Sequence, residues 1–258
     1  MDDTPHGAAI TTEDFGLEGP RGWVFRGVEV RAEPGSLVAV TGPSGSGRTC
    51  LLLALTGRMR PSSGTAAVAG LPLPRRMSAV RALSALAHVP GVTELDPALT
   101  VAEHLRERTL LRRRFGGPLL GPLRRGARAR EERAHAEAAL AAAGLEVPAL
   151  PRGAATAVRD LGRVEALRLS LALALVGRPR LIAVDDADLK LSPAEREEVW
   201  ALLRSLAAAG PTVLAVCGEP PEGAVVVRAR DHEKHAKHEK REKREKGASG
   251  ALAETGRA

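Results

Sequence analysis

The chain has 258 residues, of which 44% are hydrophobic, 27% charged and 2% aromatic, and its formal net charge is +7. This length fits one large α/β domain, or such a domain with a smaller one inserted. Because the chain has few aromatic rings and no Tyr, its composition disfavours the stacking surfaces that bind single-stranded nucleic acid. Residues 228–246 hold nine Lys and Arg against five Asp and Glu, which is +4 of the net charge. The basic pI therefore says little about the folded part.

The sequence predicts neither secretion nor a membrane span. Acidic residues follow Met1 with no apolar run behind them, which is unlike a signal peptide. The longest apolar stretch, near residues 167–176, contains Arg168 and is too short to cross a bilayer. Cys50 and Cys217 lack metal-ligand spacing, so we expect both to be small buried hydrophobic residues in a reducing cytoplasm.

Apolar, strand-like segments recur along the chain, and helical patterns separate them. The segments are residues 24–30, 37–41, 65–69, 85–89, 181–184, 212–216 and 224–227. This alternation predicts an α/β fold with a mostly parallel sheet covered on both faces. We expect the early strands to form a separate antiparallel patch.

A glycine-rich loop follows the strand predicted at residues 37–41. Its spacing, G-x-x-x-x-G-x-T, lets backbone N–H groups and the positive end of the next helix point at phosphate oxygens. A simple turn between a strand and a helix is the alternative. The predicted nucleotide-binding residues are Gly42, Pro43, Ser44, Gly45, Ser46, Gly47, Arg48, Thr49 and Cys50.

The helix after this loop is predicted from Arg48 to about Arg58, with an apolar run at residues 51–55. Arg48 stands where the phosphate-loop pattern has lysine. Its planar guanidinium brings positive charge but is bulkier than an ammonium group. Arg48 also fits a general preference for arginine, because Lys190 is the only lysine before Lys234.

A helical and strongly basic block is predicted at residues 100–162. Between Glu103 and Arg133 it has ten Arg against four Glu, and Pro118, Gly121 and Pro122 divide it. Such a block suits a solvated helix face, and it also suits the inner face of a membrane or a phosphate-bearing partner.

Two adjacent carboxylates, Asp185 and Asp186, follow the apolar strand at residues 181–184. Ligands of open α/β sheets collect at the carboxyl ends of strands. A turn with a helix cap is the alternative interpretation. Together with the phosphate loop, the pair predicts that Asp185 holds Mg²⁺ beside Thr49 and that Asp186 stands near the attacking water.

The order of these landmarks resembles the nucleotide-binding subunit of an ATP-binding cassette (ABC) transporter, over about residues 10–228. Residues 27–36 are similar to the lead-in to the family's first motif, and residues 99–105 are similar to its LTVxExL segment. Residues 168–179 resemble the helix and turn that precede the second carboxylate strand.

The resemblance implies a P-loop NTPase fold of the ABC type, with a mostly parallel core sheet, an antiparallel β subdomain and an inserted helical subdomain. The cassette would cover residues 1–230, with the helical subdomain at about 92–162. Residues 231–258 would form a charged, low-complexity tail, either disordered or a solvated helix.

Against the family pattern, the chain lacks several groups that surround the terminal phosphate. Gly91 stands in place of a glutamine, and Gly218 in place of the switch histidine. Residues 161–165 replace the Ser- and Gly-rich signature, and Ser192 replaces an aspartate. Asp186 is one methylene shorter than the family's glutamate. We therefore expect ATP binding to survive better than hydrolysis.

For the aromatic residue that stacks on adenine in the family, Phe15 and Trp23 are the candidates.

The resemblance thus implies the ATP-binding subunit of an ABC transporter, with ATP and Mg²⁺ as cofactors and Asp186 as the candidate catalytic residue of an ATPase. Its partners would be a membrane-spanning permease and a second cassette, identical or different, at the cytoplasmic face of the plasma membrane. A non-hydrolysing ATP-binding regulatory or scaffold module is the second interpretation. A nucleic-acid-associated ATPase is the third, and the scarce aromatics weigh against nucleic acid as a partner.

Overall fold

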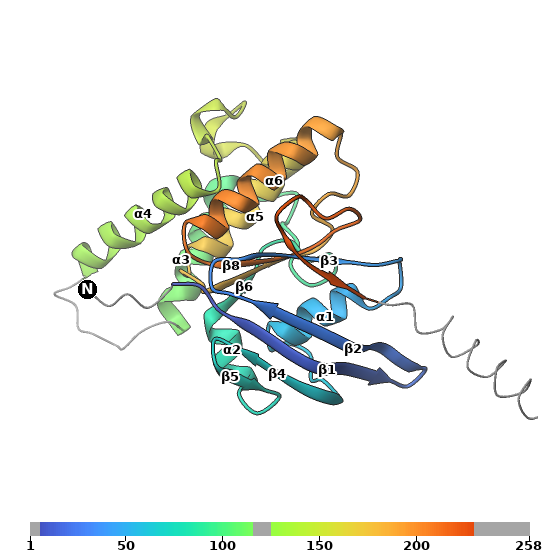
Figure 1. Ribbon diagram of the computed structural model, residues 1–258. Helices are drawn as coiled ribbons and strands as arrows, with labels where there is room; N and C mark the ends of the chain where they lie inside the picture. Colours follow the sequence, from blue (N-terminus) through green and yellow to red (C-terminus); the bar gives the residue numbers. More distant parts are fainter. Residues whose placement is uncertain (1–5, 116–124, 230–258) are drawn as a thin grey trace, which may run out of the picture.

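The computed structural model describes residues 6–115 and 125–229, which form two sheets with helices around them (Figure 1). In the antiparallel sheet the strand order is β2-β1-β4-β5. Its strands are β1 (Ile10–Gly19), β2 (Gly22–Ala32), β4 (Ser63–Val68) and β5 (Leu71–Leu73). In the parallel sheet the order is β6-β7-β8-β3-β9. Its strands are β3 (Leu37–Thr41), β6 (Ser84–Leu86), β7 (Leu181–Val184), β8 (Thr212–Val216) and β9 (Val225–Arg228).

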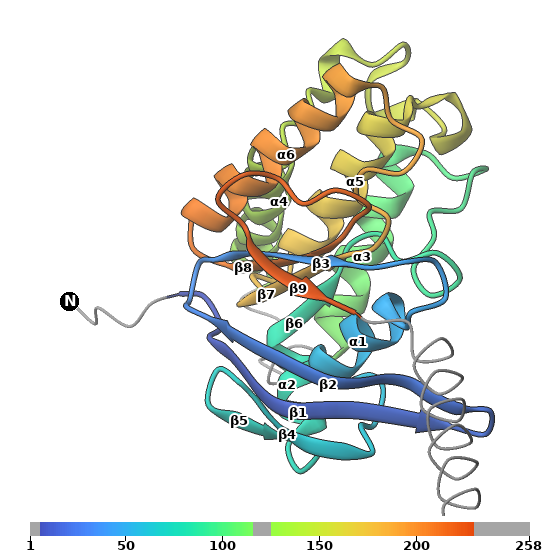
Figure 2. The ribbon, with the colours of Figure 1, turned by 45° about the vertical axis from the view of Figure 1, so that its right-hand side comes forward.

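Helices cover both faces of the parallel sheet. Figures 1 and 2 show α1 between the two sheets, and α5 and α6 on the opposite face of the parallel sheet. The α-helices are α1 (Arg48–Leu55), α2 (Met77–Leu83), α3 (Val101–Phe115), α4 (Arg125–Ala142), α5 (Arg163–Leu175) and α6 (Pro193–Ala208). Three short 3₁₀ helices join α4 to α5: η2 (Val147–Ala149), η3 (Gly153–Ala155) and η4 (Val158–Asp160).

The side chains of β3 alternate between two cores, as the two-residue period of a strand requires. Val38 and Val40 belong to the core that the parallel sheet shares with α1 and the antiparallel sheet. Leu37 and Ala39 belong to the core shared with α5 and α6. Because both faces are buried, the central strands are continuous apolar runs.

The predicted parallel sheet and separate antiparallel patch are confirmed, with β3, β7 and β8 at the predicted residues. The helix predicted to reach Arg58 is shorter, because α1 ends at Leu55. Gly57 follows at φ 72°, a left-handed conformation that ends helices. A Cβ there would lie 2.6 Å from the Met77 carbonyl oxygen, so no side chain fits where this turn lies against α2.

Other predictions need correction. Strands β1 and β5 were not expected, and β6 ends at Leu86 rather than Val89. Of the helical block predicted at residues 100–162, the described part holds α3 to Phe115 and α4 from Arg125 to Ala142, and the residues after Ala142 form only short 3₁₀ helices before α5. The predicted break at Pro118, Gly121 and Pro122 and the tail at 231–258 lie outside the described residues. The boundaries given for the domains stay predictions.

Candidate functional site

The loop at residues 42–47 connects β3 to α1, and two of its glycines are packed too tightly for any side chain. A Cβ on Gly42 would lie 2.4 Å from the Ala229 carbonyl oxygen, and one on Gly47 would lie 2.3 Å from the Val24 carbonyl oxygen. Both glycines have positive φ, 149° and 79°. Gly45, at φ 82°, has nothing within 4 Å of a would-be Cβ. The loop therefore packs against Ala229 and Val24 at its two ends and has open space at Gly45.

Ser46 carries an unused polar atom in this loop. The residue is 3% exposed, and its Oγ has no hydrogen-bond partner among the described residues. Its backbone N–H donates to the Pro43 carbonyl at 3.2 Å. A buried hydroxyl without a partner is costly, and this one lies 2.7 Å from a would-be Cβ on Gly42, on the packed side of the loop. Pro43 and Ser44 are exposed on the same loop.

Thr49 and Asp185, which are 136 residues apart in the chain, meet at the carboxyl edge of the parallel sheet. The Thr49 hydroxyl donates to Asp185 Oδ2 at 2.5 Å. Asp185 is 3% exposed. Burial is the main reason that its pKa is raised, the hydrogen bond from Thr49 opposes the increase, and the charge of Asp186 adds to it. A hydroxyl and a carboxylate next to a phosphate loop are the protein ligands that Mg²⁺ takes together with nucleotide oxygens.

Asp186 occupies an uncommon backbone conformation directly after Asp185. Its φ is 49°, in the left-handed region that Asp tolerates better than most residues. Its N–H donates to Asp185 Oδ1 at 2.9 Å. Half-buried, Asp186 lines a cavity of about 450 Å³ together with His88 and Arg163. Asp186 thus borders the space between the end of β7 and the start of α5.

Arg48 reaches away from the loop toward the end of β8. Its Nη1 donates to the Cys217 carbonyl at 3.1 Å. Its charge also lowers the pKa of Asp185, so the guanidinium lies near the carboxylate pair, and the role at the phosphate stays a prediction. Cys50 is half-buried against the core, and burial, followed by the charge of Asp185, raises the pKa of its thiol. The predicted contact of Cys50 with nucleotide stays a prediction.

Sequence analysis missed Asp188, which binds the backbone beyond β8. Its carboxylate accepts the Gly218 N–H at 3.0 and 3.1 Å and the Glu219 N–H at 3.2 Å. Gly218 is the position where the family has its switch histidine. Nothing in the local sequence marks Asp188, because its partners lie about 30 residues away along the chain.

Two further departures from the family pattern, at Gly91 and at the start of α5, have visible consequences. Gly91, at φ 72°, donates its N–H to Glu94 Oε1 at 2.8 Å. At the start of α5, the Gly162 N–H donates to Glu165 Oε2 at 2.7 Å. This helix N-terminus is therefore capped by its own carboxylate, which is the wrong charge for receiving a partner's phosphate.

The two aromatic candidates differ in exposure. Phe15 is 0% exposed and lies 5.7 Å from the Phe25 ring, centroid to centroid, so it cannot stack on a nucleotide. Trp23 is half-buried, and the Arg26 guanidinium carbon lies 5.0 Å from its ring centroid. Its chain neighbour Val24 lies against Gly47 of the phosphate loop.

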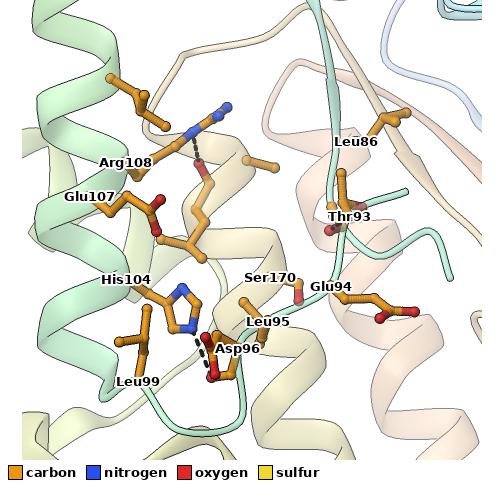
Figure 3. A pocket seen from close by; sticks show the side chains of 14 residues that line it. Leu86, Thr93, Glu94, Leu95, Asp96, Leu99, His104, Glu107, Arg108 and Ser170 are labelled. Carbon is orange, nitrogen blue, oxygen red and sulfur yellow. Dashed lines mark hydrogen bonds between the residues drawn. The ribbon is translucent and has the colours of Figure 1, made fainter. Parts of the chain in front are cut away.

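A second cavity, of about 370 Å³, opens between α3, α5 and the segment after β6 (Figure 3). Its lining is partly apolar and partly polar. Leucines come from all three segments, and the polar side chains include His104 and Arg108, which contact backbone carbonyl oxygens. The His104 ring nitrogen Nε2 lies 3.2 Å from the Asp96 carbonyl oxygen, and Arg108 Nε donates to the Leu173 carbonyl at 3.0 Å. On the same helix, Leu110 and Leu111 are 50% and 44% exposed.

Within residues 6–115 and 125–229, no group of three or more His, Cys, Asp or Glu side chains is arranged to hold a metal ion by itself. In the same part of the chain, no helix is long and apolar enough to cross a membrane.

Comparison with known proteins identifies relatives for this arrangement. A family model described as ABC transporter matches residues 25–188. The Nod factor export ATP-binding protein I of Cupriavidus metallidurans is 32% identical over 191 residues, which is 74% of this chain and 56% of the relative. The corresponding protein of Paraburkholderia xenovorans is 35% identical with the same coverage. The chain thus spans just over half the length of these relatives.

Solved structures share the fold at lower identity. CbiO1 from Clostridium perfringens, part of an ABC transporter complex, has a TM-score of 0.65 and 19% identity, covering 81% of this chain and 78% of its own. A dimeric ATP-binding cassette with ADP and Pi bound has a TM-score of 0.61 and 22% identity, covering 81% of this chain and 88% of its own.

Proposed function

Because the chain belongs to the ABC transporter family and has the fold of its ATP-binding subunits, we propose that it binds Mg-ATP between residues 42–49 and Asp185. In this proposal, binding closes the cassette against a second one, and closure drives a separate membrane-spanning permease. The loop N–H groups would hold the phosphates. Thr49 and Asp185 would hold Mg²⁺, which supplies positive charge at the phosphates.

The single observation that carries this proposal is the contact of Thr49 Oγ1 with Asp185 Oδ2 at 2.5 Å. The contact joins the two predicted metal ligands directly after the glycine-rich loop, which supports the proposal. A structural turn would not need this contact.

We further propose that hydrolysis is slow. Gly91 and Gly218 have no side chain to reach a water or a phosphate, and Glu165 occupies the start of α5. Removing one donor to transition-state charge costs about 2.7–4 kcal/mol, which is roughly 10²–10³ in rate. Such losses are not additive, yet two of them leave turnover far below the ordinary range. Asp186 is the candidate that orients or activates water.

Isothermal titration of Mg-ATP, combined with a turnover assay on the same protein, tests both parts. We expect the wild type and Asp186→Asn to bind Mg-ATP alike, since Asp186 is not a proposed metal ligand. Turnover in the wild type should be slow and should disappear in Asp186→Asn. Absence of binding would contradict the whole proposal, and fast Asp186-dependent turnover would contradict slow hydrolysis.

Binding without any turnover would favour the second function, a regulatory or scaffold module that uses nucleotide only to close. The observation behind it is the absence of side chains at Gly91 and Gly218. Sedimentation velocity with and without Mg-ATP measures closure directly, as a shift toward a dimer.

The cavity in Figure 3 is the proposed docking site for the permease. Exposed leucines beside a mixed apolar and polar cavity are typical of a protein-binding surface. We expect Leu111→Ser to reduce the fraction of the chain recovered with native membranes while Mg-ATP binding stays unchanged. Val226→Ser is the control, because Val226 is 43% exposed on β9, away from this cavity. Equal losses in both variants would argue against the docking site.

Trp23 is the proposed adenine-stacking residue. Trp23→Ala should weaken Mg-ATP binding by about 1–3 kcal/mol, the range for base–aromatic stacking. Trp23→Phe should retain most of the affinity.

A further inference from the structure

We propose that Asp188 is a positioning residue which, by holding residues 217–219, keeps the Cys217 carbonyl in place to compete with the nucleotide for the Arg48 guanidinium. The inference rests on the proposed Mg-ATP site. It adds that the Cys217 carbonyl competes with the nucleotide, so that nucleotide binds more weakly than it would if Arg48 were free.

The first half of the argument is the anchoring of residues 217–219. The Asp188 carboxylate accepts two backbone N–H groups, those of Gly218 and Glu219, at 3.0–3.2 Å. The turn that carries Asp188 is itself tied to β8, since the Ala187 N–H donates to the Val216 carbonyl at 2.9 Å. The Asp188 carboxylate is thus fixed by its own turn and binds two consecutive N–H groups, so residues 217–219 have little freedom to move.

The second half is the position of the Cys217 carbonyl. The Cys217 N–H donates to the Val40 carbonyl at 3.0 Å, which ties it to the strand that leads into the phosphate loop. Its carbonyl accepts Arg48 Nη1 at 3.1 Å. Arg48 is the first residue of α1, directly after the loop. The guanidinium is therefore held between the loop and the segment that Asp188 fixes.

The competition follows from the geometry of arginine. A guanidinium is a rigid planar fork, so a phosphate that takes the Nη1 edge of Arg48 must displace the Cys217 carbonyl that now accepts from it. With residues 217–219 fixed, the carbonyl cannot follow, and nucleotide must displace it. Freeing the segment lets the carbonyl move with Arg48, or release it, at lower cost.

A double-mutant cycle on Mg-ATP affinity tests this link. The four proteins are the wild type, Asp188→Ala, Arg48→Ala and the double variant. We expect Asp188→Ala to tighten binding by about threefold to tenfold, the size of one ordinary hydrogen bond. In the Arg48→Ala background, Asp188→Ala should change the affinity by less than about twofold.

Two control variants separate the anchoring from charge alone. Glu222→Ala removes a negative charge from the exposed part of the same loop, and it should leave the affinity unchanged. Asp188→Asn keeps one acceptor oxygen and should give an intermediate effect. Equal tightening by Asp188→Ala and Glu222→Ala, additive effects in the cycle, or weaker binding in Asp188→Ala would each overturn the inference.

A nucleotide-free readout accompanies the cycle. Amide hydrogen exchange at Gly218 and Glu219 should be faster in Asp188→Ala than in the wild type or Glu222→Ala, and unchanged exchange would overturn the anchoring. If the wild type binds no Mg-ATP, the proposed function fails and this inference with it. If the wild type binds and the cycle is additive, only the inference fails.

Discussion

Asp185 is a single residue in which stability and binding oppose each other. A carboxylate that is 3% exposed and has a pKa raised chiefly by burial is less stable as an anion than it would be in water. Proteins keep such groups at functional sites, where a ligand compensates the buried charge. Asp185 fits that description because its hydrogen bonds come from Thr49 and from Asp186, both in the proposed site.

Replacing this carboxylate should separate the two properties. In Asp185→Asn, the amide oxygen can accept the Asp186 N–H while the amide nitrogen donates to Thr49 Oγ1. We expect the unliganded variant to be more stable by about 1 kcal/mol, a usual size for single-site effects, and to lose Mg²⁺-dependent ATP binding. Urea unfolding and calorimetric titration measure the two effects. A less stable variant, or one that binds Mg-ATP normally, would refute this assignment.

The raised pKa of Asp185 also predicts a pH dependence. As pH falls through that pKa, the folded protein takes up a proton before an unfolded chain would, so the cost of the buried charge is relieved and this group's contribution to stability improves. Mg²⁺ needs the deprotonated carboxylate. Mg-ATP affinity should therefore fall on acidification, starting above the ordinary pH range of Asp, while the unliganded protein shows no loss of stability from this group. Titrations across a pH series would check the sign.

At the scale of elements, the junction of β3, the phosphate loop and α1 explains why glycine is needed at some positions more than at others. Gly47 precedes α1 at φ 79° with the Val24 carbonyl behind it, whereas Gly45 has similar φ and open space. Both positions thus need a residue that tolerates positive φ, but only Gly47 also lacks room for a side chain.

This difference gives a matched pair of variants. Gly45→Ala should cost about 1–2 kcal/mol, the penalty for an alanine at positive φ. Gly47→Ala should cost clearly more, because a Cβ would lie 2.3 Å from the Val24 carbonyl oxygen and β2 or α1 would have to move. Thermal unfolding of the unliganded variants makes the comparison. Equal midpoints for the two would show that the packing of β2 against the loop is not tight.

On the scale of the whole molecule, α1 joins the two sheets into one cooperative structure. The core around it includes residues from both sheets, such as Ile10 and Phe25 on one side and Val38 and Leu214 on the other. Because neither sheet buries this face without the other, we expect them to unfold together.

The two tryptophans report on the two sides. Trp23 belongs to β2, and Trp200, 3% exposed, packs in the core between α6 and the parallel sheet. Fluorescence of Trp23→Phe and Trp200→Phe during urea unfolding should give coincident midpoints. At 100 times Kd, Mg-ATP should raise the free energy of unfolding by about 2.7 kcal/mol, and both midpoints should rise by the same amount. Separate midpoints would show that the antiparallel sheet unfolds on its own.

Local sequence pattern was enough for much of this fold. Strands β3, β7 and β8 are buried on both faces, so each is an uninterrupted apolar run, and the phosphate loop is legible because its glycines are adjacent in the chain. Strand β1 was missed because Thr12, Glu13 and Asp14 interrupt its apolar pattern, and its pairing with β2 is irregular there. Strand β5 is only three residues long and contains Pro72.

By itself the sequence determined that a phosphate loop and a carboxylate pair follow two buried strands in an ABC-type order, because each of these signals lies within a few neighbouring residues. Only the tertiary structure decided that Thr49 meets Asp185, that Phe15 is buried, that Glu165 caps its own helix, and that Arg48 and Asp188 hold the segment after β8. Most of these contacts join residues 30 to 169 positions apart. They exist because the parallel sheet brings the carboxyl ends of β3, β7 and β8 to one edge, and no local pattern records which side chains meet there.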